Sequence, residues 1–323
     1  MLVNLYKSKS PAAVVSLPVM IALIGLSIFW MPVDEQKNTF LWQDAFTNYL
    51  LQNQLIKYLI SVAVVYFSSI ELNRQVNVFD FFSKNTYLPG FLYGICVFGF
   101  GHFGYINELI AILFLVYGMA YLFRLSRQES AISPTFMSGV LFGLATVFQP
   151  ALLPILLLPW IALSVFRSFV WREWLALILA GGLPWFQLLA IKFIATGHLG
   201  LEYYKIELAQ FNWSYELSVM SLYVFSILLS LAAFWKYLVI ARTSLLVFKK
   251  RSRIVYNAFW LLAISYVVSY YLLGTLSIVL IVPITYVVSV FMLNARSLLM
   301  ANSVVYIWLL LAAWSLYHYF SGL

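Results

Sequence analysis

The chain has 323 residues, of which 64% are hydrophobic and 9% are charged, and its mean hydropathy is +0.94. Soluble domains are about 45–50% apolar, so this composition excludes an ordinary soluble fold and indicates an all-α protein that crosses a membrane repeatedly. A transmembrane barrel is disfavoured because the apolar runs are continuous and do not alternate with period two. The net charge of +8 does not indicate nucleic-acid binding, because the basic residues flank apolar runs.

The apolar runs predict about eleven membrane-spanning helices, each of roughly 20 residues, or fewer where neighbours bury them. The first run follows two lysines, as in a signal peptide, but the sequence after it (Met31-Pro32-Val33) lacks a small-residue cleavage site, which favours a retained helix. The third run is short and rich in glycine. In chain order the predicted spans are residues 11–30, 55–72, 88–104, 107–123, 135–149, 151–166, 174–195, 217–240, 255–273, 275–293 and 300–319.

The charges predict an orientation for these spans. If the N-terminus is cytoplasmic, 15 of the 19 basic residues fall on the cytoplasmic side, and 7 of the 11 acidic residues fall on the outer side. Lys and Arg resist translocation, so the basic bias sets the orientation. An odd number of spans then places the C-terminus outside.

Two outer segments, residues 31–54 and 196–216, are rich in aromatic residues and are predicted to lie along the membrane surface. On the inner side, residues 73–87 suggest another surface helix. The basic run Lys249-Lys250-Arg251-Ser252-Arg253 reads as a topology anchor, with a lipid-headgroup or partner contact as the alternative. No long linker or repeat divides the chain, so we expect residues 1–323 to form a single integral membrane domain.

The outer acidic residues are the strongest candidates for chemistry. Nucleotide-binding and hydrolase motifs are absent, and the single cysteine, Cys96, excludes a cysteine-based metal site. Asp34 and Glu35 follow the first span directly, and Glu108 opens the fourth. Outward-facing carboxylates can deprotonate an acceptor hydroxyl or hold a divalent cation. The alternative is a solvated acidic pair near a helix start, where negative charge suits the helix dipole. No cofactor is predicted beyond the open alternative of that cation.

The middle of the chain follows a recognisable order. An acidic residue opens a span that ends in arginine. After it come a Gly-Leu-Ala segment, a polar-Pro break, a Leu/Pro-rich span, an Arg/Trp-rich inner loop and a span with Leu-Pro-Trp. In this order, residues 107–186 resemble the glycosyltransferases of the GT-C fold that use polyprenyl-phosphate sugars. The matching pieces are Glu108, Arg124, Gly143-Leu144-Ala145, Gln149-Pro150, Arg167 with Trp171-Arg172, and Leu183-Pro184-Trp185.

This resemblance implies a GT-C-like arrangement and roles for the outer residues. Asp34 or Glu35 would be the catalytic base, and Glu108 a second acidic or metal-supporting residue. The sequence departs from the family at the break, where Lys-Pro is common and this chain has Gln149-Pro150, and in a short first outer loop. The opening MLVNLYKSKSP and the layout also resemble an uncharacterised family of polytopic inner-membrane proteins of the Bacteroidota, which implies a bacterial inner-membrane location.

Further outer residues are candidate contacts for a lipid-linked phosphate. The candidates are Lys57, Lys192, Lys205, His102 and His198. A lysine ammonium binds phosphate as a point charge, and either histidine would assist the base. Lys57 and Lys192 lie within about a turn of predicted outer ends, so snorkelling to the interface explains them equally. For the histidines, an interfacial side chain with a local hydrogen bond is the alternative.

Three functions remain open on the sequence. The first is an enzyme that transfers a sugar from a polyprenyl-phosphate carrier to an acceptor on the outer face of the inner membrane. The second is a non-catalytic structural or assembly subunit of a bacterial envelope complex, which binds membrane lipids and protein partners. The third is a transporter, which has least support because ionisable residues are scarce within the spans.

Overall fold

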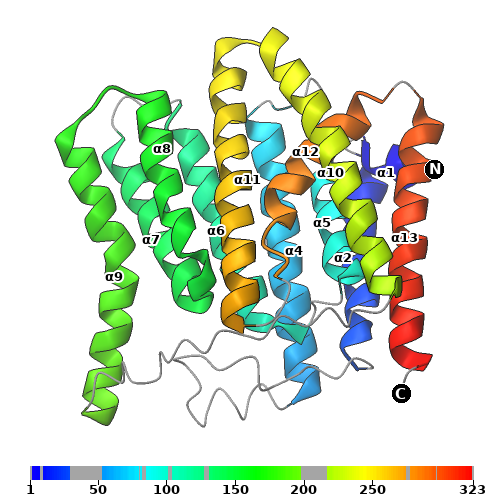
Figure 1. The fold of residues 1–323 in the computed structure, drawn as a ribbon, viewed down its shortest axis with the longest axis horizontal. Coiled ribbons are helices and arrows are strands. Elements are labelled where there is room, and N and C mark those ends of the chain that lie inside the picture. The colour runs from blue at the N-terminus through cyan, green and yellow to red at the C-terminus, as the bar shows by residue number, and fades with distance from the viewer. Residues whose placement is uncertain are drawn as a thin grey trace. The chain divides into compact units, whose positions relative to one another are not determined.

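The computed structural model describes residues 2–7, 10–29, 53–79, 81, 85–100, 104–126, 131–197, 217–273, 277–295 and 297–321. Within these ranges every regular element is a helix (Figure 1), which confirms the predicted all-α class. The elements are α1 (Leu2–Lys7), α2 (Pro11–Gly25), η1 (Leu26–Phe29), α4 (Gln54–Val78), α5 (Leu88–Gly99), α6 (Ile106–Arg124), α7 (Ile132–Phe148), η4 (Pro150–Leu156), α8 (Leu157–Phe166), α9 (Trp171–Thr196), α10 (Leu217–Thr243), α11 (Leu246–Leu273), α12 (Ile281–Leu293) and α13 (Leu298–Ser321).

Each predicted span overlaps a helix or a pair of consecutive helices. In the described part of the chain, six helical segments are long and apolar enough to cross a membrane, and five further apolar helices are shorter. The two short helices α5 and α12 are almost wholly buried by their neighbours. A buried helix need not match the hydrocarbon thickness on its own, because surrounding protein satisfies the backbone beyond its ends. The stretch before α12 illustrates this, since Ser277, Ile278 and Val279 are non-helical yet buried.

The predicted surface helix over residues 73–87 is wrong. Helix α4 continues without interruption to Val78, and Asn73, Gln75 and Val76 are at most 2% exposed. Asn73 and Gln75 are polar, but their faces of α4 pack into the bundle. The predicted outer segments 31–54 and 196–216 lie almost entirely outside the described residues and stay predictions.

The helices form two compact units. Unit 1 comprises Met1–Leu109, Trp213–Lys249 and Ile281–Leu323, and unit 2 comprises Ile110–Asn212 and Lys250–Leu280. The expectation of a single membrane domain stays a prediction, because compactness alone does not show whether the units fold or move separately.

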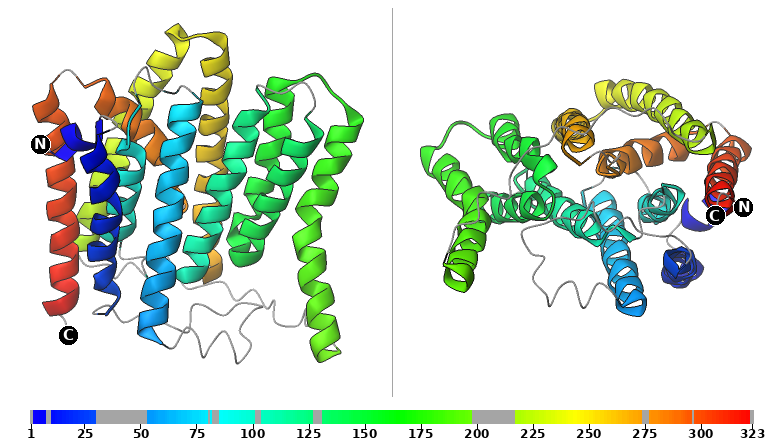
Figure 2. Two further views of the ribbon diagram at one scale, coloured as in Figure 1. Left: turned by 180° about the vertical axis from the view of Figure 1, so that it is seen from behind. Right: turned by 60° about the horizontal axis from the view of Figure 1, so that its bottom comes forward.

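Unit 1 is built around α5, which packs against α2, α4, α12 and α13 (Figure 2). The closest approach is at Gly90, where a Cβ atom would lie 2.5 Å from Asn73 Nδ2 and 2.6 Å from the Ser69 carbonyl oxygen. The Gly90 N–H donates to Asn73 Oδ1 at 2.8 Å. At one end of the unit, Thr86 Oγ1 donates to the Tyr6 carbonyl oxygen at 2.9 Å, which attaches α1 to the start of α5.

Unit 2 is dominated by the packing of α7 against α9. Gly139 and Gly143 lie one turn apart on α7, in the small-xxx-small spacing that lets membrane helices approach closely. A Cβ atom at Gly143 would lie 2.6 Å from the Gly181 carbonyl oxygen, and one at Gly139 would lie 2.7 Å from Ala180 Cβ. These contacts fix the spacing of the two helices that carry the cavity described next.

Candidate functional site

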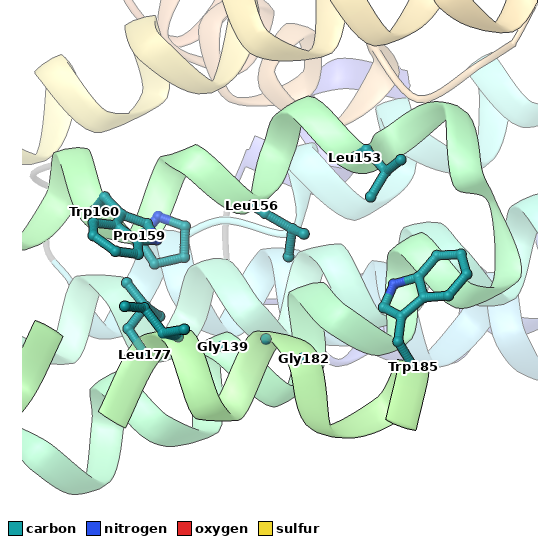
Figure 3. Close-up of a pocket in the computed structure, with 10 residues that line it drawn as sticks. Gly139, Leu153, Leu156, Pro159, Trp160, Leu177, Gly182 and Trp185 are labelled. Atoms are coloured by element: carbon teal, nitrogen blue, oxygen red, sulfur yellow. The ribbon is translucent and has the colours of Figure 1, made fainter. Parts of the chain in front are cut away.

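An apolar groove of about 450 Å³ lies in unit 2 between α7, η4–α8 and α9 (Figure 3). Its ends are marked by two indole rings, Trp160 on α8 and Trp185 on α9. Leu153 and Ile178 contribute to its rim and are 50% and 53% exposed, so the groove opens at the surface of the helices. The other lining residues that matter here are Gly139, Leu156, Pro159, Leu177, Gly181 and Gly182.

The groove exists because α9 presents glycine opposite η4. A Cβ atom at Gly182 would meet no atom within 4 Å, and one at Gly181 would meet only Leu156 Cδ2, at 3.8 Å. The break after α7 helps to shape the opposite wall. Gln149 leaves the helical conformation at φ −137°, and residues 150–156 continue as a 3-10 helix that contains Pro154.

Hydrogen bonds fix the wall at Trp185. The indole N–H donates to Thr146 Oγ1 at 2.9 Å, and the Thr146 hydroxyl donates to the Gly143 carbonyl oxygen at 2.7 Å. The one polar atom of the ring is therefore satisfied by α7, which leaves its apolar surface to line the groove. Because the lining side chains are hydrocarbon apart from two indole nitrogens, the groove suits an alkyl or isoprenoid chain better than a polar solute.

Lys192 lies on the same face of α9 as Trp185. The two residues are seven positions apart, which is close to two helical turns and about 10 Å along the axis. Lys192 is half-buried. A chain that runs along the groove past Trp185 would bring its head toward this ammonium group, so the structure relates one sequence-predicted phosphate contact to the apolar groove.

Unit 1 contains a buried polar network that the sequence analysis missed. Arg74 donates to Glu71 through Nε and Nη2, each at 2.7 Å, and Gln75 Nε2 donates to Glu71 Oε1 at 3.2 Å. Tyr286 of α12 donates its hydroxyl to Gln75 Oε1. The Glu71 side chain is 5% exposed and that of Arg74 is 46% exposed, so the carboxylate is inside the bundle while the guanidinium reaches its edge.

A sequence signal for this network was present. Ser61, Ser68 and Gln75 follow one another at intervals of seven, which places them on one face of a helix, and Glu71 lies one turn before Gln75. All four are at most 4% exposed. A polar stripe that persists through an apolar helix indicates a face turned toward other helices.

Glu108 lies in the first turn of α6 and is 7% exposed. Lys57 lies in the first turn of α4 and is half-buried. The other described carboxylate, Glu173, accepts from Arg167 Nη1 at 3.2 Å. Across the described ranges, no three His, Cys, Asp or Glu side chains are grouped so that they could hold a metal ion.

The remaining predicted site residues are outside the described part of the chain. These are Asp34, Glu35, His102, His198 and Lys205. Whether Asp34 or Glu35 lies near Glu108 therefore stays a prediction.

Comparison of the sequence with family models and with curated proteins, and of the fold with solved structures, yields no match. The site must accordingly be interpreted from its own chemistry.

Proposed function

We propose that this protein is a multi-pass protein of a bacterial inner membrane that binds a polyprenyl-phosphate-linked sugar and transfers the sugar to an acceptor on the outer face. The observation that carries the proposal is the apolar groove of unit 2 with Lys192 two turns beyond Trp185 on the same face of α9. An isoprenoid chain fills a hydrocarbon-lined groove, and an ammonium group attracts the phosphate at its head.

The proposed topology follows the charges. Eleven helices or helix pairs cross the membrane, the N-terminus is cytoplasmic and the C-terminus is outside. The described basic residues support this orientation: Lys7, Arg74, Arg124 and Arg242 all lie at helix ends that this topology places in the cytoplasm. In this orientation Lys192 and Glu108 lie toward the outer face.

In the proposed reaction, a carboxylate removes the proton from an acceptor hydroxyl, whose oxygen then attacks the anomeric carbon of the carrier-linked sugar. The bond from that carbon to the carrier phosphate breaks, and the phosphate leaves with the bonding electron pair. Asp34 or Glu35 would be the base. Glu108 would assist as a second acidic group, and Lys57, Lys205, His102 and His198 stay candidate contacts to the phosphate or acceptor.

Binding tests the groove directly. The full chain in phosphatidylcholine nanodiscs is titrated with undecaprenyl phosphate, and with phosphatidylglycerol as an anionic lipid that lacks the isoprenoid chain. We expect Gly182→Leu, which fills open space in the groove, and Lys192→Gln each to weaken binding of undecaprenyl phosphate by about tenfold. Arg172→Gln, at the exposed opposite end of α9, is the matched control. Equal affinity of all three variants and the wild type would exclude the groove as the carrier site.

Catalysis is tested separately. In its native cells, Asp34→Asn with Glu35→Gln, or Glu108→Gln, should abolish a lipid-linked glycan product without reducing the amount of folded protein. If envelope glycans are unchanged in both variants, the protein is not a glycosyltransferase that depends on these carboxylates.

A second candidate function is a non-catalytic assembly subunit. The observation in its favour is that all three described carboxylates are buried, at 7% exposure or less, and two of them are ion-paired. Carboxylates that are buried and already ion-paired are poorly placed to receive a proton from a substrate. Retained carrier binding with unchanged glycans in the carboxylate variants would support this candidate.

A further inference from the structure

The apolar groove of unit 2 has a defined length along α9. Its lining residues on this helix run from Leu177 to Trp185, eight positions apart, which corresponds to about 12 Å of helix axis. Lys192 lies seven positions further, so about 22 Å of axis separates it from Leu177. An extended isoprenoid chain covers roughly 5 Å per unit, because each unit adds four carbon–carbon bonds in a zigzag. The stretch from Lys192 to Leu177 therefore matches about four isoprene units.

The groove is closed at the end marked by Trp160. Figure 3 shows Trp160 and Leu177 together at the end opposite Trp185. The Trp160 ring packs edge-to-face against that of Trp174, with 5.0 Å between ring centroids and an interplanar angle of 84°. The ring of Trp174 in turn lies 5.2 Å from that of Phe169. Side chains packed in this way leave few gaps, so these rings stop a chain that runs along the groove from Trp185.

The groove is open along its side near the same end. Ile178, which contributes to the rim, is 53% exposed, and Leu175 and Leu179, outside the lining, are 47% and 60% exposed. All three belong to Trp171–Ile194, a segment long and apolar enough to cross a membrane. Exposed apolar side chains of a membrane-spanning helix face lipid tails. A chain longer than the groove would therefore turn out past Ile178 and continue in the bilayer.

Only the part of a chain that enters the groove changes its surroundings on binding. Lipid tails are as apolar as leucine, so a prenyl chain gains little hydrophobic free energy when it leaves the bilayer for a protein groove. It gains dispersion contacts with the walls instead, which are small for each atom pair and add up along the chain. Units beyond Ile178 lie in lipid before and after binding, so they do not raise the affinity.

We propose that this site recognises its ligand by the phosphate and the first four or so isoprene units, and that it is indifferent to the length of the chain beyond them. The substrate class is then prenyl-phosphate carriers in general, short chains included, and not the long undecaprenyl carrier alone. This inference rests on the proposed carrier site, and it adds which part of the carrier the protein reads.

A series of chain lengths tests the inference. The full chain in phosphatidylcholine nanodiscs is titrated with geranyl, farnesyl, geranylgeranyl and undecaprenyl phosphate, which carry two, three, four and eleven isoprene units. Affinities are expressed per mole fraction of ligand in the membrane, which removes differences in partitioning. We expect the affinity to rise about tenfold from geranyl to geranylgeranyl phosphate, and by less than about threefold from there to undecaprenyl phosphate. A larger rise beyond four units, or equal affinity for the two shortest and the four-unit chains, would overturn the inference.

Two variants separate the contact to the head from the contacts to the chain. The chain of geranyl phosphate is about 10 Å long and ends near Trp185. Gly182→Leu should therefore leave its affinity unchanged but weaken binding of geranylgeranyl phosphate by about tenfold. Lys192→Gln should weaken all four ligands by the same factor. Leu179→Phe, which enlarges an exposed side chain outside the groove lining, is the matched control and should weaken none.

The same variants distinguish failure of this inference from failure of the proposed function. If neither Gly182→Leu nor Lys192→Gln changes the affinity for any ligand, the carrier site itself is wrong. If Gly182→Leu weakens undecaprenyl phosphate but not geranylgeranyl phosphate, the carrier site stands and the limit of about four units is wrong. Equal losses in Gly182→Leu and Leu179→Phe would also overturn the limit, because the chain would then contact α9 outside the groove.

Discussion

The two units bury different kinds of contact. Unit 1 encloses charged and amide groups, with Glu71, Arg74 and Gln75 of α4 joined to Tyr286 of α12. The principal helix contact of unit 2, between α7 and α9, relies on glycines one turn apart, whereas the close glycine approach of α5 to α4 in unit 1 is accompanied by a side-chain hydrogen bond. Hydrogen bonds specify which partners meet, while glycine contacts maximise dispersion and leave hollows where a glycine has no neighbour. Only the second kind produces a groove that fits a hydrocarbon chain.

The largest effect is expected in the polar network. Arg74→Leu should lower the free energy of unfolding by about 3 kcal/mol, because it leaves the Glu71 carboxylate buried without its cation. The measurement is SDS titration of the full chain in mixed micelles. Glu71→Gln is the control, since it removes the buried charge but keeps hydrogen-bonding capacity, and should cost less. Equal losses would show that burial of the charge is not what makes this network sensitive.

A smaller loss of unfolding free energy is expected at the glycine contact between α7 and α9. Gly143→Ala places a methyl group against the Gly181 carbonyl oxygen, so the helices must separate, at a cost of about 2 kcal/mol. Gly182→Ala on α9 is a matched control, because its methyl group would meet nothing within 4 Å. Thermal unfolding in detergent should show a clear loss only for the first variant. If both behave alike, helix propensity outweighs packing here.

The hydrogen bond between Tyr286 of α12 and Gln75 of α4 should contribute still less to the free energy of unfolding. Tyr286→Phe removes the donor to Gln75 Oε1 and should lower the free energy of unfolding by about 1 kcal/mol. The control is Tyr66→Phe, on a half-buried tyrosine of α4, for which we expect almost no change. A larger effect at Tyr66 would contradict the assignment of the hydrogen bond as the source of the loss.

The smallest effect on the free energy of unfolding concerns the ion pair between Arg167 and Glu173 in unit 2. Glu173→Gln keeps an amide oxygen that can accept from Arg167, whose side chain is 22% exposed, and removes a negative charge from the first turn of α9, so the expected loss is about 0.5 kcal/mol. SDS titration should detect a shift well below that of Arg74→Leu. A loss of similar size would erase the contrast between the two units.

Sequence patterns predicted the helices better than the functional site. Each long apolar run overlaps a helix in the described part of the chain, because a lipid-facing helix must be apolar over much of its length. The apolar runs did not predict where a helix continues through polar residues that are buried against other helices. Asn73 and Gln75 read as interfacial polar residues, yet α4 continues through them because α5 and α12 offer hydrogen bonds. Lys192 was singled out by its position near a span end, but nothing in its neighbourhood in the sequence revealed the groove two turns away.

The sequence by itself determined the helical class and the approximate helix positions, and it predicts an orientation, because these follow from hydropathy and charge along one dimension. The tertiary structure alone decided which glycines contact a neighbouring helix and which border open space. It also decided which polar residues meet across helices. Gly143 and Gly182 look alike in sequence, but one touches a carbonyl oxygen and the other borders a cavity. That distinction depends on the placement of a second helix, which local composition does not encode.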